Sequence, residues 1–316
     1  MKEKFLRVQN LTKNYGDFCA VDNLSFSVDE GEIFGLLGPN GAGKSTTMNV
    51  ITSLCDFSRG SVSVDGMDIV KEKSKVRRVI GMVPQEIALY PFLTAEENVK
   101  FFASLYGLRG KELNSAAKQA LEFTGLSSRA KVKPKKMSGG MKRRLNIACG
   151  IAHHPKLIIM DEPTVGVDAQ SREHILGSIK TLRERGATVI YTSHYMNEVE
   201  EICDRIAIID HGKFVACGTE QELVSTVSNS RALKITTELK SGVSADELIS
   251  ELSKLPDVKK ARIDENEIIL EINLSQKDFT LYLEHIQKRG LPIYAVTSES
   301  INLEDVFIAL TGRELR

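Results

Sequence analysis

The sequence has few cysteines, no long apolar run and no excess of charge of either sign. Its five cysteines are scattered along the chain and form no Cys-x-x-Cys pair. An odd number at irregular spacing indicates neither a zinc site nor a disulfide framework. Reduced thiols in a cytoplasm are therefore the simplest interpretation.

The chain also lacks the marks of a membrane-spanning or secreted protein. No apolar stretch approaches the ~18 residues that a membrane-spanning helix needs. The N-terminal residues 1–5 are charged and contain no apolar signal core. We therefore expect that, if this protein works at a membrane, another polypeptide supplies the membrane-embedded part.

Charge and length set two more bounds. Basic and acidic residues both number 42, so the formal net charge is zero and the general electrostatic footprint of nucleic-acid binding is missing. A chain of 316 residues with ordinary apolar and charged content predicts one large globular domain or two. We find neither an internal repeat nor a low-complexity segment.

The strongest motif is a glycine-rich stretch that fits the phosphate-loop pattern G-x-x-x-x-G-K-[ST]. An apolar strand is predicted before it, at residues 32–37, and a helix after it, at residues 46–51. The glycines allow backbone N–H groups to turn inward, and the helix N-terminus adds positive potential for an anion. We expect Lys44 to reach the β- and γ-phosphates and Ser45 to hold Mg²⁺. The predicted triphosphate-binding residues are Gly38, Pro39, Asn40, Gly41, Ala42, Gly43, Lys44, Ser45 and Thr46.

The remaining pattern predicts an α/β fold with a helical insert. Residues 5–30 alternate in polarity and predict antiparallel strands. From about residue 86 to 136 the periodicity is helical, and Thr94 with Glu97 forms a capping-box signal. Alternating strands and helices return at residues 138–222, where the apolar strand 157–160 is typical of a sheet covered on both faces.

The sequence pattern changes after a small polar linker at residues 225–230. The pattern predicts strand, helix, strand, strand, helix and strand between residues 231 and 299, which is the ferredoxin-like order. A last helix is predicted at residues 303–315. We therefore predict a first domain at residues 1–224, with its helical subdomain at about 86–136, and a C-terminal accessory or regulatory domain at 231–316.

Five features in a fixed order, over about residues 4–222, resemble the ATP-binding subunit of an ABC transporter. They are the phosphate loop, Gln85 at a strand end, Ser138-Gly139-Gly140, the strand with Asp161 and Glu162, and His194 at another strand end. The resemblance implies a P-loop NTPase cassette with a RecA-like core, an antiparallel β subdomain and a helical subdomain. It also implies ATP and Mg²⁺ as cofactors.

The resemblance assigns roles to these residues. Asp161 would support Mg²⁺ together with Ser45, and Gln85 would touch the metal or the attacking water. Glu162 would polarise that water, and His194 would contact the γ-phosphate. Tyr15 by itself is equally consistent with a turn aromatic and with a base-stacking residue, and the resemblance favours stacking on the base.

Ser138-Gly139-Gly140 is a second anion-binding turn at a helix N-terminus. In the family, this turn binds the ATP held by the partner subunit, so each ATP lies between Lys44 of one chain and Ser138 of the other. Asp168 resembles the residue that crosses this interface. The resemblance thus implies a homodimer or heterodimer of ATPase subunits that drives a separate permease, with no nucleic-acid partner. Such a subunit is cytoplasmic and peripheral on the inner face of the membrane.

The apolar run at residues 89–93, Leu-Tyr-Pro-Phe-Leu, is the candidate for gripping a permease helix, although core packing of the helical insert would also explain it. The sequence departs from the family pattern at two places, the signature turn and the loop before Asp168. Met141 replaces the usual Gln of the signature, which puts any contact of that side chain with nucleotide in doubt. Val165 and Val167 replace the common Ser and Leu.

The signature variant and the C-terminal sequence at residues 303–313 resemble the drug- and antibiotic-resistance exporter branch. Two other functions are alternatives to a transporter subunit. An ABC-type ATPase acting on ribosomes or DNA usually carries two cassettes or a long coiled coil, and neither is present. A soluble regulatory module would use residues 231–316 as a ligand sensor, but no convergent polar site is evident there, so dimer support or gating is favoured.

Overall fold

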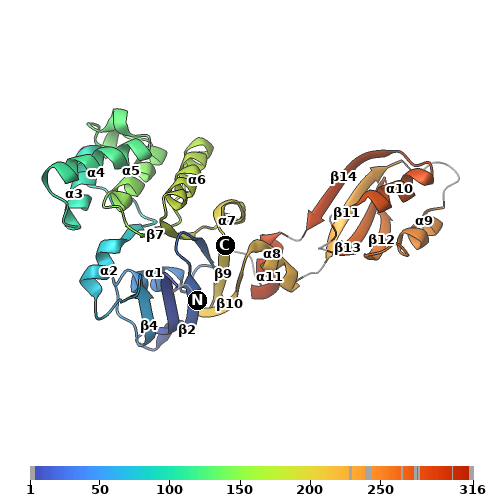
Figure 1. Ribbon diagram of the computed structural model, residues 1–316, viewed down its shortest axis with the longest axis horizontal. Helices are drawn as coiled ribbons and strands as arrows, with labels where there is room; N and C mark the ends of the chain where they lie inside the picture. The colour runs from blue at the N-terminus through green and yellow to red at the C-terminus, as the bar shows by residue number, and fades with distance from the viewer. Residues whose placement is uncertain are drawn as a thin grey trace. The chain divides into compact units, whose positions relative to one another are not determined.

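The computed structural model describes residues 4–227, 230–238, 244–264, 266–273, 276, 278–300 and 302–312. These residues form two compact units. The first ends at Glu220, and the second runs from Gln221 to Gly312 (Figure 1).

A six-stranded sheet lies at the centre of the first unit. Its order is β10-β9-β3-β8-β7-β6, and all neighbours are parallel except the pair of β9 with β10. β3, β7 and β8 are buried at every position, as expected for strands covered on both faces. The strands are β3 (Ile33–Leu37), β6 (Ile80–Val83), β7 (Leu157–Asp161), β8 (Thr188–Thr192), β9 (Arg205–Asp210) and β10 (Lys213–Gly218).

A second, antiparallel sheet of the first unit has the order β2-β1-β4-β5 and confirms the predicted alternation near the N-terminus. Its apolar side chains share one core with those of the six-stranded sheet. Phe26 of the one sheet stacks on Phe34 of the other, with ring centroids 5.5 Å apart. The strands are β1 (Leu6–Tyr15), β2 (Phe18–Val28), β4 (Arg59–Val64) and β5 (Met67–Asp68).

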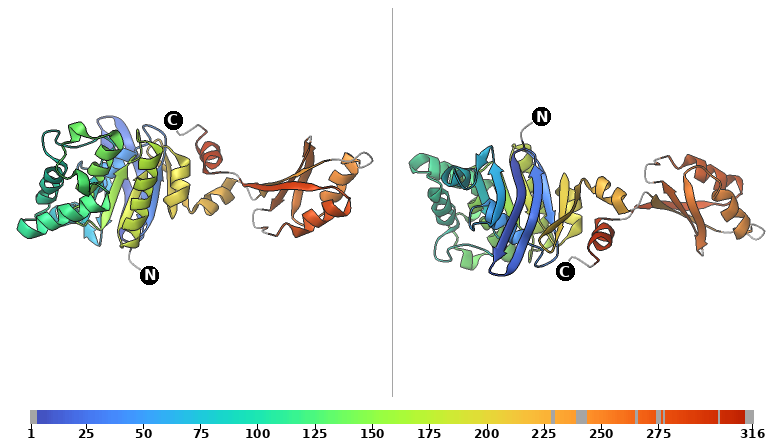
Figure 2. Two further views of the ribbon diagram at one scale, coloured as in Figure 1. Left: turned by 90° about the horizontal axis from the view of Figure 1, so that it is seen from above. Right: turned by 90° about the horizontal axis from the view of Figure 1, so that it is seen from below.

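Helices complete the first unit. α3, α4 and α5 pack on one another and gather at the end of the unit opposite to β9 and β10 (Figure 2). The predicted capping box is present, because Thr94 Oγ1 accepts the N–H of Glu97 and the Glu97 carboxylate accepts the N–H of Thr94. The helices are α1 (Lys44–Ile51), α2 (Lys73–Val79), α3 (Ala95–Leu105), α4 (Gly110–Phe123), α5 (Gly139–Ile151), α6 (Ala169–Glu184) and α7 (Met196–Ile202).

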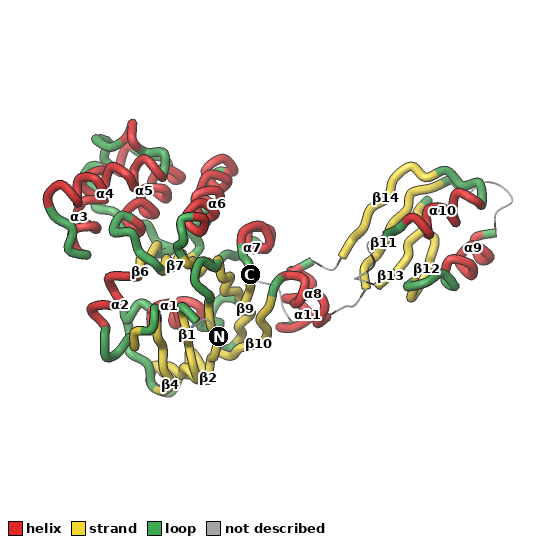
Figure 3. The backbone as a smooth tube through the Cα atoms, in the orientation of Figure 1, coloured by secondary structure: helices red, strands yellow, loops and turns green. Residues whose placement is uncertain are grey.

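The second unit contains the predicted β-α-β-β-α-β order (Figure 3). All its strands pair antiparallel in the order β12-β13-β11-β14, and α9 and α10 cover the core of this sheet. The elements are β11 (Ser230–Thr237), α9 (Ala245–Leu252), β12 (Val258–Asp264), β13 (Glu267–Asn273), α10 (Thr280–Lys288) and β14 (Ile293–Ser300).

Two short helices flank this sheet in the sequence. Where the sequence predicts a linker from residue 225, α8 (Glu220–Val227) forms, with Leu223 and Val224 buried. Burial of apolar side chains stabilises such a short helix more than its intrinsic propensity does. The last helix, α11 (Leu303–Thr311), is shorter than predicted because Gly312 ends it in the left-handed conformation. Residues 228, 229 and 313–316 lie outside the described residues.

Candidate nucleotide-binding site

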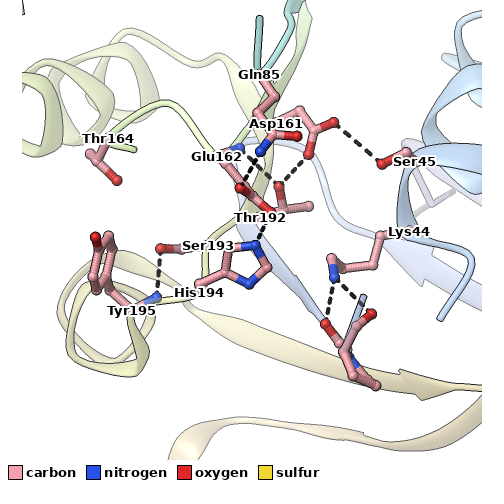
Figure 4. A network of polar contacts seen from close by, with 12 residues as sticks. Lys44, Ser45, Gln85, Asp161, Glu162, Thr164, Thr192, Ser193, His194 and Tyr195 are labelled. Carbon is pink, nitrogen blue, oxygen red and sulfur yellow. Dashed lines mark hydrogen bonds and ion pairs between the residues drawn. The ribbon is translucent and has the colours of Figure 1, made fainter. Parts of the chain in front are cut away.

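Four parallel strands deliver predicted site residues to one edge of the six-stranded sheet. β3 leads into the phosphate loop, β6 is followed by Gln85, β7 ends at Asp161, and β8 is followed by His194. The carboxyl ends of parallel strands share one edge of a sheet, and the loops that leave them form ligand crevices. Figure 4 shows these side chains gathered at one place, facing the residues that begin α1.

The phosphate loop between β3 and α1 has a backbone that requires glycine. Gly41 and Gly43 adopt φ angles of 82° and 98°, in the left-handed region. A Cβ on Gly43 would also lie 2.6 Å from the carbonyl oxygen of Ala20. Because α1 begins directly after Gly43, the loop lies at the partially positive end of a helix. This arrangement is a cradle for an anion.

The ammonium group of Lys44 lies against this loop. Its side chain is buried, and Nζ donates hydrogen bonds to the carbonyl oxygens of Gly38 and, at 3.2 Å, Pro39. Burial lowers the pKa of Lys44, while the negative charges of Glu162 and Asp161 oppose that change. A buried cation beside a helix N-terminus favours the binding of a phosphate group.

Asp161 lies opposite the start of α1. The Ser45 hydroxyl is 3.5 Å from Asp161 Oδ2, and the Thr192 hydroxyl donates to Asp161 Oδ1 at 2.8 Å. Thr192 Oγ1 also accepts the backbone N–H of Glu162 at 3.0 Å. Sequence reasoning missed Thr192, although a hydroxyl at the last position of a wholly buried strand is a detectable signal.

Glu162 is held in a strained backbone conformation and contacts two other predicted residues. Its φ of 48° is rare for a residue with a side chain and costs of order 1–3 kcal/mol. Gln85 Nε2 donates to Glu162 Oε2 at 2.8 Å, and His194 Nε2 lies 2.5 Å from Glu162 Oε1. Burial raises the pKa of Glu162, against the opposing effect of His194. The structure thus joins the three residues that the sequence predicts to be catalytic.

Tyr15 stands apart from this network. It ends β1 with its ring half exposed, and the Nζ atom of Lys13 lies 4.7 Å from the ring centroid. None of the contacts among the described residues joins Tyr15 to the phosphate loop. Its open ring face is compatible with stacking on a planar base.

The second predicted anion-binding turn forms a separate cluster. Ser138 caps α5 and accepts the N–H of Met141 at 3.2 Å. Asp168 caps α6 and accepts both the N–H and the hydroxyl of Ser171, at 2.8 and 2.9 Å. The two caps are neighbours, because a Cβ on Gly140 would lie only 3.1 Å from Asp168 Oδ2. No contact among the described residues joins this cluster to the phosphate loop of the same chain.

Gly140→Ala is expected to destabilise this cluster, whereas Gly139→Ala is expected to be tolerated. A Cβ on Gly140 would lie 2.7 Å from the Cβ of Ser171, but the nearest atom to a Cβ on Gly139 is the Gly166 oxygen at 3.7 Å. Overpacking of this kind costs about 1–3 kcal/mol. Urea unfolding should show the loss in Gly140→Ala alone.

The double variant Gly140→Ala/Ser171→Gly provides the control for that clash. It should lose less stability than the sum of the two single variants, because the added methyl group then has room. Equal stability of wild type and Gly140→Ala would contradict the close packing of α5 against α6.

The apolar run at residues 89–93 lies on the surface and is fixed by one buried side chain. Asn98, at 0% exposure, accepts the N–H of Tyr90 at 2.8 Å and donates to the carbonyl oxygens of Tyr90 and Leu93 at 3.1 and 3.2 Å. Phe92 is 71% exposed, and Leu105 of α3 is 66% exposed. Leu105 also lines a cavity of about 500 Å³ between α2, β6 and the end of α3.

Comparison with known proteins places this geometry among transporter ATPases. Residues 21–165 match the profile of the family described as ABC transporter. The chain is 45% identical over 313 residues to the linearmycin resistance ATP-binding protein LnrL of Bacillus subtilis (strain 168), which covers 98% of this chain and 99% of that protein. It is 34% identical over 311 residues to the Nod factor export ATP-binding protein I of Sinorhizobium fredii, covering 98% of this chain and 87% of that protein.

A solved structure is similar in the cassette region. It is the dimeric structure of a post-hydrolysis state of an ATP-binding cassette bound to ADP and Pi, with a TM-score of 0.62 and 32% identity. The match covers 68% of this chain and 98% of that chain. Among the described residues of the present chain, no helix is both long enough and apolar enough to cross a membrane.

Proposed function

The chain belongs to the ABC transporter family as an ATP-binding subunit with ATPase activity, and we propose that it powers export through a separate membrane permease. The observation that carries this proposal is the convergence of a phosphate loop, a Ser45–Asp161 pair and a Glu162–His194 contact at one sheet edge. Phosphoryl transfer to water needs three such parts: a phosphate cradle, oxygen ligands for a metal, and a group that orients the water.

The contacts around Glu162 support a division of labour in hydrolysis. Glu162 would polarise the attacking water, since its carboxylate lies at the end of β7 within the network. Gln85 and His194 contact the two carboxylate oxygens of Glu162 and would orient that side chain. Gln85 would also touch the metal or the water, and His194 would also contact the γ-phosphate. Ser45 and Asp161 would hold Mg²⁺, which prefers oxygen ligands and would neutralise phosphate charge.

The remaining predicted residues would bind the rest of the nucleotide. Residues 38–46 would surround the phosphates, and the exposed ring of Tyr15 would stack on the adenine. Binding through a base stack and a phosphate cradle leaves the γ-phosphate at the sheet edge, where Glu162 lies.

The separation of the Ser138-Gly139-Gly140 cluster from the phosphate loop supports a shared site. One chain has little use for two anion-binding helix ends at a single triphosphate. We propose that two subunits pack head to tail, so that each γ-phosphate lies between Lys44 of one chain and Ser138 of its partner. Asp168, which caps α6 beside Gly140, would then face that interface.

The exposed run at residues 89–93 is the proposed contact with the permease. Only residues 86–88 separate it from Gln85, so a movement of Gln85 at the nucleotide is passed to this surface along a short stretch of backbone. Exposed apolar side chains in a group are typical of a protein interaction site.

Phe92→Asp should abolish co-purification with the permease while leaving the ATPase rate of the isolated subunit unchanged. Phe92 is 71% exposed, so the substitution perturbs the fold little but adds a charge to an apolar contact. The measurement is recovery of the two proteins together from detergent-solubilised membranes of cells that express both.

Phe214→Asp serves as the matched control. Phe214 is a half-exposed aromatic on β10, at the opposite edge of the six-stranded sheet from β6. It should keep the permease bound. Retention of the permease by Phe92→Asp would remove residues 89–93 from the interface. The identity of the co-purifying membrane protein also tests whether the role is transport.

The relatives named for linearmycin resistance and Nod factor export support an export role. We propose that the cargo is a drug, an antibiotic or a lipid-like compound, selected by the permease. The subunit would then work at the cytoplasmic face of the membrane. The sheet domain at residues 231–300, together with α11, is proposed to be an accessory domain that supports the dimer or gates the cassette.

A further inference from the structure

Glu198 is a buried carboxylate that the proposed chemistry does not use. It lies in α7, four residues after His194, and is 1% exposed. A charged side chain in such a place is costly unless several donors surround it. Its contacts therefore indicate what it holds in position.

Three hydroxyl donors and one cation surround Glu198. Its Oε2 atom accepts hydrogen bonds from the hydroxyl groups of Thr164 at 2.8 Å, Tyr191 at 2.7 Å and Ser193 at 2.7 Å. Its Oε1 atom pairs with Arg172 Nε at 3.2 Å. Thr164 and Arg172 belong to the loop after β7 and to α6, whereas Tyr191 and Ser193 belong to the end of β8 and the loop that follows it. One carboxylate thus joins residues 164–172 to residues 191–193.

The first consequence concerns His194. Ser193, which precedes it, donates to Glu198, and the same hydroxyl oxygen accepts the N–H of Tyr195 at 3.0 Å. The guanidinium of Arg172 lies over the Tyr195 ring, 4.5 Å from its centroid. Both neighbours of His194 are therefore fastened to Glu198 or its ion pair. Figure 4 shows Ser193 and Tyr195 on the side of His194 away from Lys44.

The second consequence concerns the loop that leads to Asp168. Thr164 begins this loop two residues after Glu162, and its side chain is fully buried. Arg172 lies in the first turn of α6, the helix that Asp168 caps. Glu198 therefore contacts the loop at its start through Oε2 and just after its end through Oε1, while Oε2 also accepts the hydroxyl of Ser193, the residue before His194.

We infer that Glu198 is a positioning residue that couples His194 to the loop at residues 164–168. The inference rests on the proposed function, in which His194 contacts the γ-phosphate and Asp168 faces the partner subunit. Because both loops share one carboxylate, a shift of either one changes the hydrogen bonds of the other. The state of one nucleotide is in this way transmitted toward the second site.

The test is Glu198→Gln in the full chain. Glutamine keeps the size, but whichever way its amide is turned, an NH₂ group faces either the hydroxyl donors or Arg172. We expect kcat to fall about 10- to 100-fold through misplacement of His194, with the KM for ATP changed by less than about twofold. The Hill coefficient for ATP should fall to about 1, because the two sites are no longer coupled.

Glu201→Gln is the matched control. Glu201 lies on α7, as Glu198 does, and pairs at 2.8 Å with Lys180, which lies on α6, as Arg172 does. Both side chains of this pair are about half exposed. This variant should keep the wild-type kcat and Hill coefficient. The comparison separates loss of this buried network from loss of any ion pair between α6 and α7.

Two smaller substitutions keep the test decisive if Glu198→Gln does not fold. Tyr191→Phe and Thr164→Val each remove one hydroxyl donor and leave the carboxylate with others. Each should lower kcat and the Hill coefficient in the same direction, by about 3- to 10-fold for kcat. A merely structural role would instead lower the fraction of active protein, measured by ATP binding, with both constants unchanged per active subunit.

Wild-type kcat and cooperativity in these variants would overturn the inference. Failure of the proposed function is a distinct result, since the wild-type chain itself would then show no ATP turnover that depends on Glu162.

Discussion

Glu162→Gln should lower ATP turnover by orders of magnitude while leaving ATP binding intact. The amide keeps the shape of the side chain but cannot take up a proton from water. General-base catalysis contributes about 10²- to 10⁴-fold, so phosphate release should fall by that factor. Binding should persist because Lys44 and the phosphate loop do not depend on the charge of Glu162 for their position. An ATP-bound dimer should therefore accumulate, visible by size-exclusion chromatography.

The same residue predicts the pH dependence of the wild-type enzyme. Burial raises the pKa of Glu162 above that of an ordinary glutamate. The base is active only when deprotonated, so kcat should fall as the pH drops through this raised pKa, at a higher pH than for an exposed carboxylate. The residual activity of Glu162→Gln should lack that acid limb.

Glu184→Gln, a change at an exposed acid near the end of α6, controls for the loss of one negative charge. It should leave turnover and its pH profile unchanged. Undiminished turnover in Glu162→Gln would show that another group orients the water.

Two inactive variants, Lys44→Ala and Gly139→Asp, should restore activity when they are mixed. Each ATP is proposed to lie between Lys44 of one chain and the Ser138-Gly139-Gly140 turn of the other. A dimer made of one chain of each kind then contains one complete site and one site that lacks both halves. With random pairing, about half of the dimers are mixed and each has one complete site of two, so at most about a quarter of the wild-type turnover should return, with less if the complete site depends on its neighbour.

The structure identifies Gly139 as the better place for the second variant. A Cβ there would lie 3.7 Å from its nearest neighbour, the Gly166 oxygen, so the chain should fold and the added carboxylate should repel phosphate. At Gly140 the same change would disturb the fold through Ser171. Loss of activity in Gly139→Asp is thus attributable to the partner's nucleotide.

Lys44→Ala mixed with Glu162→Gln is the matched control. Both residues belong to the same half of the shared site, so every site in a mixed dimer lacks one of them and no activity should return. Recovery in this mixture, or none in the first, would contradict the head-to-tail arrangement. The readout is phosphate release, compared with the sum of the two separate variants.

Much of the site follows from the sequence because its parts are local. The phosphate loop needs only a strand, glycines with positive φ and a helix start, and all three are adjacent in the chain. Gln85, Glu162 and His194 each follow a parallel strand, and such strand ends meet at one edge wherever the strands sit in the sheet. The capping box of Thr94 and Glu97 is equally local.

The tertiary structure decided what depends on partners distant in the chain. One such feature is the order of the strands in the sheet. Others are contacts between residues 30 or more positions apart, namely those of Thr192 with Asp161 and Glu162 and the packing of Ser171 against Gly140. α8 extends to Val227, into the predicted linker at residues 225–230, and is held by the buried side chains of Leu223 and Val224. In the sequence, Glu198 is an ordinary acidic residue of a helix. Only the fold brings three hydroxyl groups and Arg172 to its carboxylate. The carboxylate needs these partners because burial removes the water that would otherwise solvate it.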